Sequence, residues 1–328
     1  MPTIYRTGQR IDHYEIIRLL AGGGASSVYL AQDHSALQQV ILKFPHDDII
    51  GGAAIFTRYK REEEISNLLS HPNIQRHLNR GEQRSREYLV LEYLRGRTLQ
   101  AVMNEYAPAL LPTLEVLHII SQVCRTLVYV HKQGVIHRDI KPENIMLLDN
   151  GEIKLLDFGI AMRERDRQVI WRGFSSPIGT PDYMAPELWW AESGSVKTDI
   201  YAVGVVLYEL LCGQTPFEEH NGFVLITRHL SHDPAGILER NPALSPALAT
   251  VVMRAIGRDP SKRYACMQDL LHDLGHLDEV TPITYIPDPP KFGGQYRQVI
   301  HIALIVLIIC FGIVAFGMLA QYVHHSIR

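Results

Sequence analysis

Residues 137–144, with the sequence HRDIKPEN, carry several side chains that could act together on one substrate. Asp139 supplies a carboxylate, Lys141 an ammonium group and Asn144 an amide, all within six positions. A helical pattern precedes this stretch and a strand pattern follows it, so these polar side chains lie in a loop between two regular elements. A carboxylate can accept a proton, and an ammonium group can stabilise developing negative charge. We therefore interpret the stretch as a catalytic loop.

Two further motifs accompany the loop, DFG at residues 157–159 and VILK at residues 40–43. Together, the three motifs closely resemble the catalytic core of the protein kinase family. The resemblance covers about residues 14–275. It implies an α+β protein kinase fold with two lobes, a β-rich small lobe near residues 14–94 and a helical large lobe that continues to about residue 278.

The resemblance also implies a reaction. Phosphoryl transfer passes through a loose transition state with charge on the oxygens, so the protein mainly positions groups and neutralises charge. Asp139 would accept or orient the proton of a substrate hydroxyl, and Lys141 would approach the transferring phosphate. Asn144 would hold a metal ion beside Asp157. The expected cofactors are ATP and Mg²⁺, with Mn²⁺ as the alternative metal ion.

The residues that follow Asp139 indicate the class of hydroxyl group. Lys141-Pro142-Glu143 is similar to the serine/threonine kinases, whereas tyrosine kinases usually carry alanine and arginine here. The resemblance therefore implies a kinase that acts on serine and threonine residues of proteins and that phosphorylates itself. Dimerisation would allow one copy to phosphorylate the other.

A membrane-tethered pseudokinase, which would bind nucleotide or a partner without transferring phosphate, is the alternative interpretation. Inactive family members usually lack the catalytic aspartate, the strand lysine or the metal-binding aspartate. This chain keeps Asp139, Lys43 and Asp157. Only Ala21, at a place where the family has glycine, favours the alternative.

A glycine-rich turn joins two β-rich runs, residues 14–20 and 28–32, and its small side chains would let the backbone approach a phosphate closely. The family has glycine at three places in this turn, which are occupied here by Ala21, Gly23 and Ser26. The residues expected to contact the nucleotide in this region are Ala21, Gly22, Gly23, Gly24, Ser26 and Val28.

Lys43 is the only charged residue in an apolar, strand-like run, residues 39–44. A bare ammonium group is costly to bury, so Lys43 needs a partner. The helical stretch 55–69 offers three consecutive glutamates, residues 62–64. Counting back from the HPNI motif that follows, which resembles the family's post-helix turn, we expect Glu62 to pair with Lys43.

Residues 88–94, with the sequence YLVLEYL, predict a buried strand that runs into a hinge. In the family this strand and hinge hold the adenine base. The resemblance places Leu91 at the gatekeeper position. It places Glu92 and Leu94 in the hinge, where backbone groups would form hydrogen bonds with the base.

Periodic patterns predict the elements that position these groups. Apolar residues recur with a helical period through residues 113–132, which indicates a core helix. Residues 145–148 and 153–156 flank an Asn-Gly pair, which favours a tight hairpin that carries the predicted metal ligands at its two ends. The apolar helix at residues 200–212 is too short to cross a bilayer and is expected to be the central buried helix of the large lobe.

Residues 160–184 are polar and rich in arginine, and they resemble an activation segment closed by an APE motif. In the family, the arginine directly before the catalytic aspartate, here Arg138, usually binds a phosphate on this segment. Ser175 and Ser176 are the expected phosphorylation sites. Thr180 is expected to serve the substrate-facing loop through its hydroxyl group.

Three more residues are expected to have structural roles. Asp199 resembles the family residue that braces the backbone of the catalytic loop. Glu187, in the APE motif, resembles the partner of a buried arginine, which is Arg263 in this sequence.

The overall composition excludes several classes of protein. The chain has 328 residues, 46% of them hydrophobic, which is enough for the core of a two-lobed domain. A formal net charge of -3 shows no basic excess, so no nucleic-acid partner is expected. The four cysteines lie far apart without CxxC spacing and are expected to be buried, reduced thiols. Residues 1–13 form a polar N-terminal extension without the apolar core of a signal peptide.

The predicted kinase domain comprises residues 14–278. The residues that follow it have a different composition. Residues 279–298 are rich in proline and glycine and predict an extended linker. Residues 299–322 are predicted to cross a lipid bilayer, because residues 302–320 contain no charge and would span about 28 Å as a helix. Residues 323–328 form a short tail. We expect a single-pass membrane protein with its kinase domain in the cytoplasm.

Overall fold

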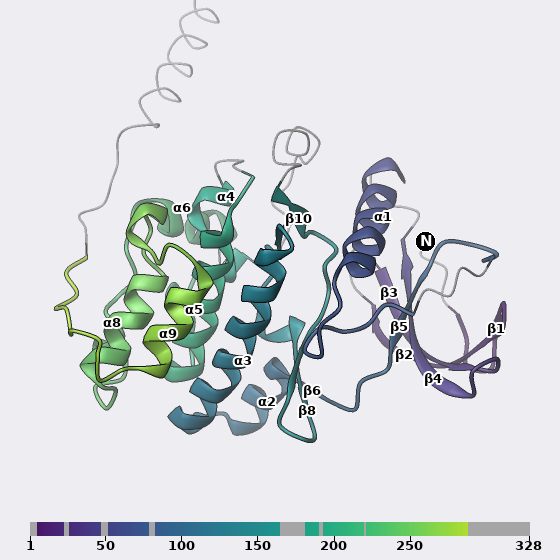
Figure 1. Cartoon of the computed structure of the whole chain (residues 1–328), viewed down its shortest axis with the longest axis horizontal. Coiled ribbons are helices and arrows are strands. Elements are labelled where there is room, and N and C mark those ends of the chain that lie inside the picture. Colours follow the sequence, from purple (N-terminus) through teal and green to yellow (C-terminus); the bar gives the residue numbers. More distant parts are fainter. Residues whose placement is uncertain are drawn as a thin grey trace, which may run out of the picture.

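The computed structural model describes residues 5–22, 26–46, 52–78, 83–164, 181–189, 193–219 and 221–287. These residues form two lobes, one built on a β-sheet and helix α1 (Gly52–Leu68) and the other mainly helical (Figure 1). The described part of the chain therefore confirms the predicted α+β architecture with two lobes.

The small lobe is built on an antiparallel sheet whose strands, in the described residues, have the order β1-β2-β3-β4-β5. The strands are β1 (Arg10–Ile11), β2 (Tyr14–Gly22), β3 (Ser26–Asp33), β4 (Gln38–Pro45) and β5 (Leu89–Glu92). The strands predicted at residues 14–20, 28–32 and 39–44 are confirmed, and β5 lies within the predicted run 88–94. Strand β1 was not predicted, because its two residues are too few to show a periodic pattern.

Alternation along β4 decides which side chains point toward α1. Val40, Leu42 and Phe44 pack into an aromatic-rich core on one face of the sheet. Ile41 lies on the other face, where it packs with Tyr59 of α1. Lys43 is two residues from Ile41 and therefore also points toward α1.

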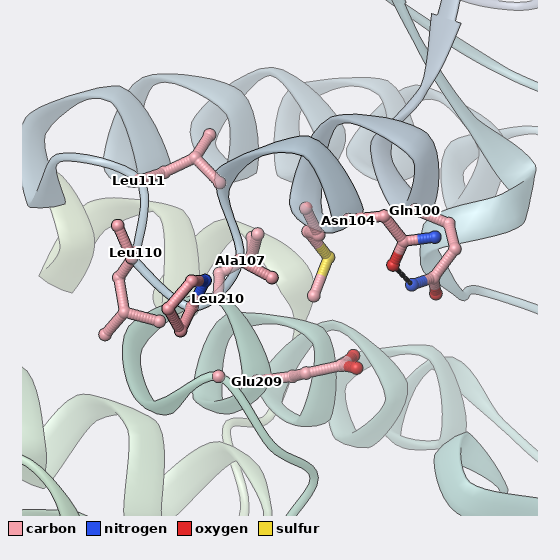
Figure 2. A pocket seen from close by; sticks show the side chains of 11 residues that line it. Gln100, Asn104, Ala107, Leu110, Leu111, Glu209 and Leu210 are labelled. Carbon is pink, nitrogen blue, oxygen red and sulfur yellow. Dashed lines mark hydrogen bonds between the residues drawn. The ribbon is translucent and has the colours of Figure 1, made fainter.

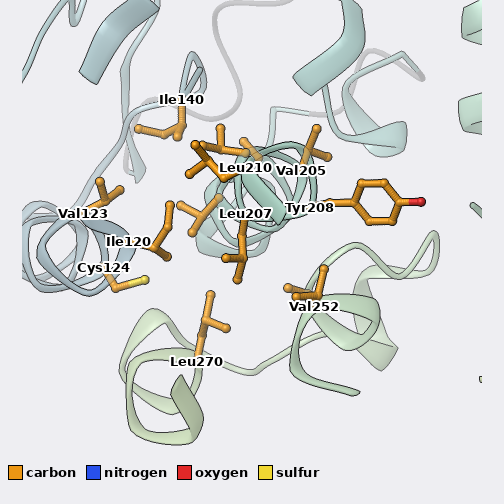
Figure 3. Packing of buried hydrophobic residues seen from close by; sticks show 14 of the residues in the cluster. Ile120, Val123, Cys124, Ile140, Val205, Leu207, Tyr208, Leu210, Val252 and Leu270 are labelled. Carbon is orange, nitrogen blue, oxygen red and sulfur yellow. The ribbon is translucent and has the colours of Figure 1, made fainter. Parts of the chain in front are cut away.

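Helix α5 occupies the centre of the large lobe. The helices of this lobe are α2 (Leu99–Tyr106), α3 (Thr113–Lys132), α4 (Pro186–Trp189), α5 (Val196–Cys212), α6 (Gly222–Ser231), α7 (Ile237–Arg240), α8 (Pro246–Ala255) and α9 (Met267–Gly275). Figure 3 shows Val205, Leu207 and Leu210 of α5 packed among side chains from α3, α8 and α9. At Gly204, an added Cβ would lie 2.7 Å from Ile256, so glycine permits the close approach of α5 to the chain at the end of α8. The predicted central buried helix is confirmed.

Helix α3 begins and ends at the predicted residues, 113 and 132. Of the residues with the predicted apolar period, Ile120, Cys124 and Leu127 are buried, but Leu114 is 82% exposed. In the first turn it is Val116 that faces the core, and it is 0% exposed. The cysteine prediction was also wrong in one place. Cys124 on α3 is buried, whereas Cys266 is exposed at the residue that precedes α9.

Two small sheets, one of three strands and one of two, frame the catalytic loop in the described residues. Strands β8 (Ile145–Leu148) and β9 (Ile153–Leu155) form the predicted hairpin, and β6 (Gly96–Thr98) pairs with β8. Gly151 has φ 80° in the hairpin turn, a conformation that favours glycine. Strand β7 (Val135–Ile136), before the loop, pairs with β10 (Met162–Arg163), after the DFG motif.

The start of the predicted linker packs against the large lobe. Ile283 N–H donates a hydrogen bond to Thr250 Oγ1 of α8 (3.0 Å), and Tyr285 Oη donates to the carbonyl oxygen of Pro234 (3.0 Å). Within the described ranges, none of the helices is both long and apolar enough to cross a bilayer. The predicted span at residues 299–322 lies outside those ranges.

The predicted pair of Glu187 and Arg263 is confirmed. Two guanidinium nitrogens of Arg263 donate to the two carboxylate oxygens of Glu187, each at 2.9 Å. Thr198 Oγ1 donates to the same carboxylate at 3.0 Å. The Arg263 side chain is 0% exposed, so its buried positive charge is stabilised by Glu187 and by the backbone carbonyl groups to which it donates hydrogen bonds. The pair fixes the APE motif beside the start of α5.

Arg263→Met is expected to lower the free energy of unfolding by about 3–5 kcal/mol, because it leaves Glu187 as a buried charge without its cation. Urea unfolding of the variant and the unchanged chain measures this difference. Arg97→Met is the matched control, since Arg97 is 56% exposed in its ion pair with Glu105 and such a pair contributes about 1 kcal/mol or less. Equal destabilisation in the two variants would contradict the structural role of Arg263.

Candidate active site

The catalytic-loop backbone is held by Asp199 at the start of α5. Asp199 Oδ2 accepts a hydrogen bond from His137 N–H (2.9 Å), and Oδ1 accepts one from Arg138 N–H (2.8 Å). His131 Nε2 lies 2.7 Å from Oδ2. Burial alone would raise the pKa of Asp199, but the interaction with His131 and the backbone N–H groups keeps that pKa below its ordinary value. The predicted brace is therefore confirmed, and it supports Arg138 at φ 67°, a strained conformation for a non-glycine residue.

Asp139, Lys141 and Asn144 lie together, as predicted. Lys141 Nζ is 3.1 Å from Asp139 Oδ2. Asn144 Nδ2 donates to the same oxygen and to the Asp139 carbonyl oxygen, at 2.8 Å in both cases. The Lys141 and Asp139 side chains are 18% and 16% exposed, so the carboxylate is fixed by neighbours yet open to solvent on one side. The carboxylate is thus positioned to take part in proton transfer.

A second cluster joins Lys43, Glu62 and Asp157 from three separate elements. Lys43 Nζ donates to Glu62 Oε1 (2.8 Å) and Oε2 (2.9 Å), and to Asp157 Oδ1 (2.9 Å). The pairing of Lys43 with Glu62 is therefore confirmed. The Lys43 and Glu62 side chains are 14% and 7% exposed, whereas Asp157 is 42% exposed and so accessible to a ligand.

The charges in this cluster are interdependent. Burial alone would lower the pKa of Lys43, but Asp157 and Glu62 together raise it above its ordinary value. Lys43 holds the pKa of Asp157 down at about 2, against the opposing effect of burial. Burial raises the pKa of Glu62 to about 7, and the charge of Asp157 adds to this rise while Lys43 opposes it. One ammonium group thus serves two carboxylates, and Asp157 stays ionised.

Phe158 and Gly159 of the DFG motif allow α1, which carries Glu62, to lie close to Asp157. Phe158 is buried among Ile65 of α1, Leu69 directly after α1, and residues of the large lobe, and this packing holds α1 against that lobe. An added Cβ at Gly159 would lie 3.0 Å from Asp157 Oδ1 and 3.3 Å from Glu62 Oε2. Glycine therefore leaves room for the cluster. This packing was not predicted, although the DFG motif itself marked both positions.

The predicted nucleotide contacts divide into three groups. Val28 pairs with Lys43 in the ladder between β3 and β4, so their side chains share one face of the sheet. Leu91 pairs with Ile41 and is buried with residues of this same face, and Leu94 is also buried. Ala21, Gly22 and Ser26 lie at the ends of β2 and β3, whereas Gly23 and Gly24 fall outside the described residues.

The side chain of Glu92 ties the hinge to the catalytic hairpin. Its carboxylate accepts hydrogen bonds from Lys154 of β9 and from the backbone and side chain of Arg76. Burial would raise the pKa of Glu92, but these hydrogen bonds lower it. The Glu92 carbonyl oxygen also accepts from Gln75 Nε2 (2.9 Å). Only a backbone role had been predicted for Glu92, and the single lysine in the apolar run of β9 was the signal that could have identified its partner.

Arginine side chains gather beside the catalytic loop. Burial lowers the pKa of Arg138 to about 10, and the nearby positive charge of Arg61 on α1 adds to this effect. Arg163 lies on β10, where it pairs with Val135 of β7, the strand that precedes the catalytic loop. The phosphorylation sites predicted at Ser175 and Ser176, and Thr180, lie outside the described residues.

Comparisons with known proteins identify the family. Residues 14–274 match the family described as "Protein kinase domain". The chain is 32% identical over 268 residues to serine/threonine-protein kinase PrkC of Bacillus subtilis, an alignment that covers 81% of this chain and 41% of PrkC. It is 32% identical over 284 residues to serine/threonine-protein kinase PknB of Mycolicibacterium smegmatis, which covers 85% of this chain and 44% of PknB. The chain thus spans less than half the length of these relatives.

Solved structures agree with this assignment. The crystal structure of the PknI kinase domain from Mycobacterium tuberculosis has a TM-score of 0.65 to this chain and 26% sequence identity, over 84% of this chain and 100% of that domain. The match therefore includes both lobes, which the hydrogen bond between Lys43 and Asp157 of the DFG motif connects. The chain belongs to the protein kinase family, and its similarity is to bacterial serine/threonine kinases.

Proposed function

We propose that the protein is an ATP-dependent serine/threonine protein kinase. The observation that carries this proposal is that two clusters of charged and polar side chains are both assembled in the site. Lys43 contacts both Glu62 and Asp157, while Asp139 is held by Lys141 and Asn144. Kinases need the lysine–glutamate pair and the DFG aspartate in place at the same time. The names of the relatives, which are serine/threonine kinases, support the same activity.

Each residue of the site would have a separate role in phosphoryl transfer. When bound, ATP supplies the phosphoryl group and Mg²⁺ offsets its negative charge. Lys43 would hold the nucleotide phosphates and is itself oriented by Glu62. Asp139 would orient the substrate hydroxyl and take up its proton, and Lys141 would stabilise negative charge on the transferring group.

The donor groups fit a hard divalent cation. Mg²⁺ prefers oxygen ligands and is commonly held by one or two carboxylates together with substrate phosphates. Asp157 offers an ionised carboxylate that is 42% exposed, and Asn144 offers an amide oxygen, since its nitrogen donates to Asp139. Asp157 and Asn144 would therefore hold Mg²⁺, with Mn²⁺ as an alternative.

Incubation of the full chain with ATP and Mg²⁺, followed by intact mass measurement, tests the proposal. Covalent addition of phosphate to the chain, or to a serine peptide in the same mixture, is the expected result. Nucleotide binding without any phosphate transfer would favour the pseudokinase instead. Replacement of ATP by ADP is the control for phosphate already present on the purified protein.

We further propose that phosphorylation of the activation segment switches the enzyme on. Arg138 is the expected phosphate ligand, and the neighbouring positive charge of Arg61 supports an anion at this place. The double variant Ser175→Ala/Ser176→Ala is expected to lose about tenfold or more of its activity toward a protein substrate while it retains ATP binding. Peptide mapping of the active enzyme locates the phosphate.

Ser261→Ala is the matched control, because Ser261 is an exposed serine far along the chain from the segment. An active enzyme that carries no phosphate between residues 157 and 187 would contradict the switch and leave the kinase assignment intact. Dimerisation is proposed only as the means by which one copy phosphorylates another.

We also propose that residues 299–322 anchor the protein in a membrane, with the kinase domain in the cytoplasm where ATP is available. The uncharged run at residues 302–320 supports this, as does the pair of basic residues, Lys291 and Arg297, that precedes it. Full-length protein is expected to sediment with membranes and to require detergent for release. A chain that ends at residue 287 should remain in the supernatant, and recovery of the full chain there without detergent would refute the anchor.

A further inference from the structure

Side chains that could bind a metal ion also occur outside the site described above. The large lobe has a cavity of about 160 Å³ between α2, the loop from α2 to α3, and the end of α5 (Figure 2). Among the described residues that line it, only Glu209 has an ionisable side chain. Transition metal ions are ordinarily held by three or four side chains, so one carboxylate does not make a site. Two histidines of the region around the end of α9 provide better ligands.

His272 and His276 place two imidazole rings side by side. The residues are four apart, so their side chains lie on one face of α9 at its C-terminal end. The rings are stacked, with 4.4 Å between their centroids and 18° between their planes. The His272 side chain is 55% exposed and His276 is also exposed, so both rings are open to solvent.

Each ring directs its Nδ1 atom toward an acceptor on the same segment. His276 Nδ1 lies 2.9 Å from the carbonyl oxygen of His272, and His272 Nδ1 lies 3.5 Å from Asp273 Oδ1. These acceptors favour the tautomer with the proton on Nδ1, which leaves the lone pair of Nε2 available to a ligand. Histidines that bind metals in proteins show the same arrangement, because their second nitrogen donates to a carboxylate or a backbone carbonyl group.

The carboxylate of Asp273 is itself held in place. Its Oδ2 accepts a hydrogen bond of 2.9 Å from Tyr264 Oη, and Arg254 lies 3.8 Å from the same oxygen. The other oxygen, Oδ1, is the one that faces His272. A fixed carboxylate in this place orients a metal-binding ring and makes it a stronger ligand. The pair of rings therefore has both the ligand atoms and the groups that orient them.

Two imidazole groups are only half of a zinc site. Structural Zn²⁺ in proteins is almost always tetrahedral, with four ligands from side chains. In the part of the chain that the structure describes, no group of three or more histidine, cysteine, aspartate or glutamate residues could hold a metal ion. A second copy of the chain, related by a twofold axis, would bring the same two histidines to the same ion and complete the four.

The position of α9 allows two copies to meet in this way. Helices α8 and α9 lie at the end of the large lobe that is far from the small-lobe sheet (Figure 1). Residues 276–287 follow α9 and lead toward the proposed membrane anchor. Two chains anchored in one membrane are confined near each other, which raises their effective concentration for a weak contact.

We infer that His272 and His276 bind Zn²⁺ together with the same two residues of a second copy, so that one ion joins two chains. Imidazole suits Zn²⁺, whereas Mg²⁺ prefers oxygen ligands, so this site is distinct from the proposed Mg²⁺ site at Asp157 and Asn144. The inference goes beyond the proposed kinase function and does not rest on it. The bridged pair would supply the dimer in which one copy phosphorylates the other.

Sedimentation velocity of the full chain in detergent solution tests the inference. The chain is measured at one concentration with EDTA, with excess Mg²⁺ and with increasing Zn²⁺. Zn²⁺ is expected to raise the association constant of the dimer about tenfold or more over its value in EDTA, as four imidazole ligands on one ion allow, and Mg²⁺ is expected to leave it unchanged. The effect should be complete at one Zn²⁺ for two chains.

The double variant His272→Gln/His276→Gln removes both ligands and should abolish the effect of Zn²⁺. His34→Gln is the matched control and should keep the effect, because His34 is a 42% exposed histidine of the small lobe that lies beside Glu15. Asp273→Asn keeps both rings but removes the carboxylate that faces His272 Nδ1. It is expected to weaken Zn²⁺ binding about 10-fold to 100-fold. Far-UV circular dichroism checks that each variant is folded.

Binding of one Zn²⁺ to each chain without a dimer, with water as the remaining ligands, would overturn the bridge. A Zn²⁺-dependent dimer that persists in the double variant, or that is lost equally in His34→Gln, would also overturn it. Unchanged affinity for Zn²⁺ in Asp273→Asn would contradict the role of that carboxylate in orienting the ring. These measurements do not involve phosphoryl transfer, so their failure would leave the proposed kinase function intact.

Discussion

Asp139→Asn is expected to lower turnover by about two to four orders of magnitude, because general-base assistance is removed from the substrate hydroxyl. The amide group has nearly the shape of the carboxylate, so the neighbours at 2.8 Å and 3.1 Å can stay in place. ATP binding should be unchanged, since Lys43 and Asp157 hold the other side of the site. The measurements are kcat with a serine peptide and the Kd of ATP for the same preparation.

Asp149→Asn is the matched control for this variant. Asp149 is an exposed aspartate in the turn between β8 and β9, so the same loss of charge occurs on the same hairpin but away from the site. It should keep full activity. Turnover of Asp139→Asn within a factor of two or so of the unchanged enzyme would exclude Asp139 from proton transfer and overturn its assigned role.

Lys43→Met is expected to lower kcat/KM for ATP by about two to three orders of magnitude. Methionine fills the volume of the lysine stem but leaves Glu62 and Asp157 without the cation that they share. A charge-assisted hydrogen bond is worth about 1.5–3 kcal/mol, and Lys43 also orients the groups that meet the phosphates. Initial rates at varied ATP concentration measure the effect. Lys60→Met, which removes an exposed lysine of α1 that pairs with Glu63, is the control.

Lys43→Met is also expected to change how the free energy of unfolding depends on pH. The pKa of Glu62 is already about 7, and the loss of Lys43 raises it further, so native Glu62 is protonated at neutral pH. A carboxyl group with a raised folded-state pKa binds more protons in the native state than in the unfolded state, and the stability that it contributes is lost as pH rises. Below about pH 7 the two proteins should lose stability at a similar rate, but above pH 7 the free energy of unfolding of Lys43→Met should continue to fall while that of the unchanged chain levels off. Parallel pH profiles would show that Glu62 does not depend on Lys43.

Local pattern was enough to predict the regular elements. Helix α3 begins at Thr113 and ends at Lys132, as its apolar period indicates, and the Asn-Gly pair marked the turn between β8 and β9. In both cases the signal lies within a few residues, because a helix face and a tight turn are set by neighbours in the chain. Strand β1 is too short to give such a signal and forms only because β2 offers it an edge.

Motif spacing also predicted part of the site. The charge of Lys43 inside an apolar strand required a partner, and the position of α1 in the sequence led to Glu62. Asp139, Lys141 and Asn144 lie within one loop, so their closeness follows from the chain itself. The family was therefore determined by the sequence alone, and so were the residues to which the catalytic roles are assigned.

Contacts between distant segments were decided only by the tertiary structure. Glu92 meets Lys154, and Glu209 meets Tyr183, across 62 and 26 residues of chain respectively. A sequence shows that each of these groups is charged or polar, but several partners of equal chemistry compete for each until packing brings one of them within reach. The burial of Phe158 against α1, which holds Glu62 at Lys43, depends in the same way on how the two lobes meet. The sequence thus determined which groups are present and their local geometry, and the packed fold selected their partners.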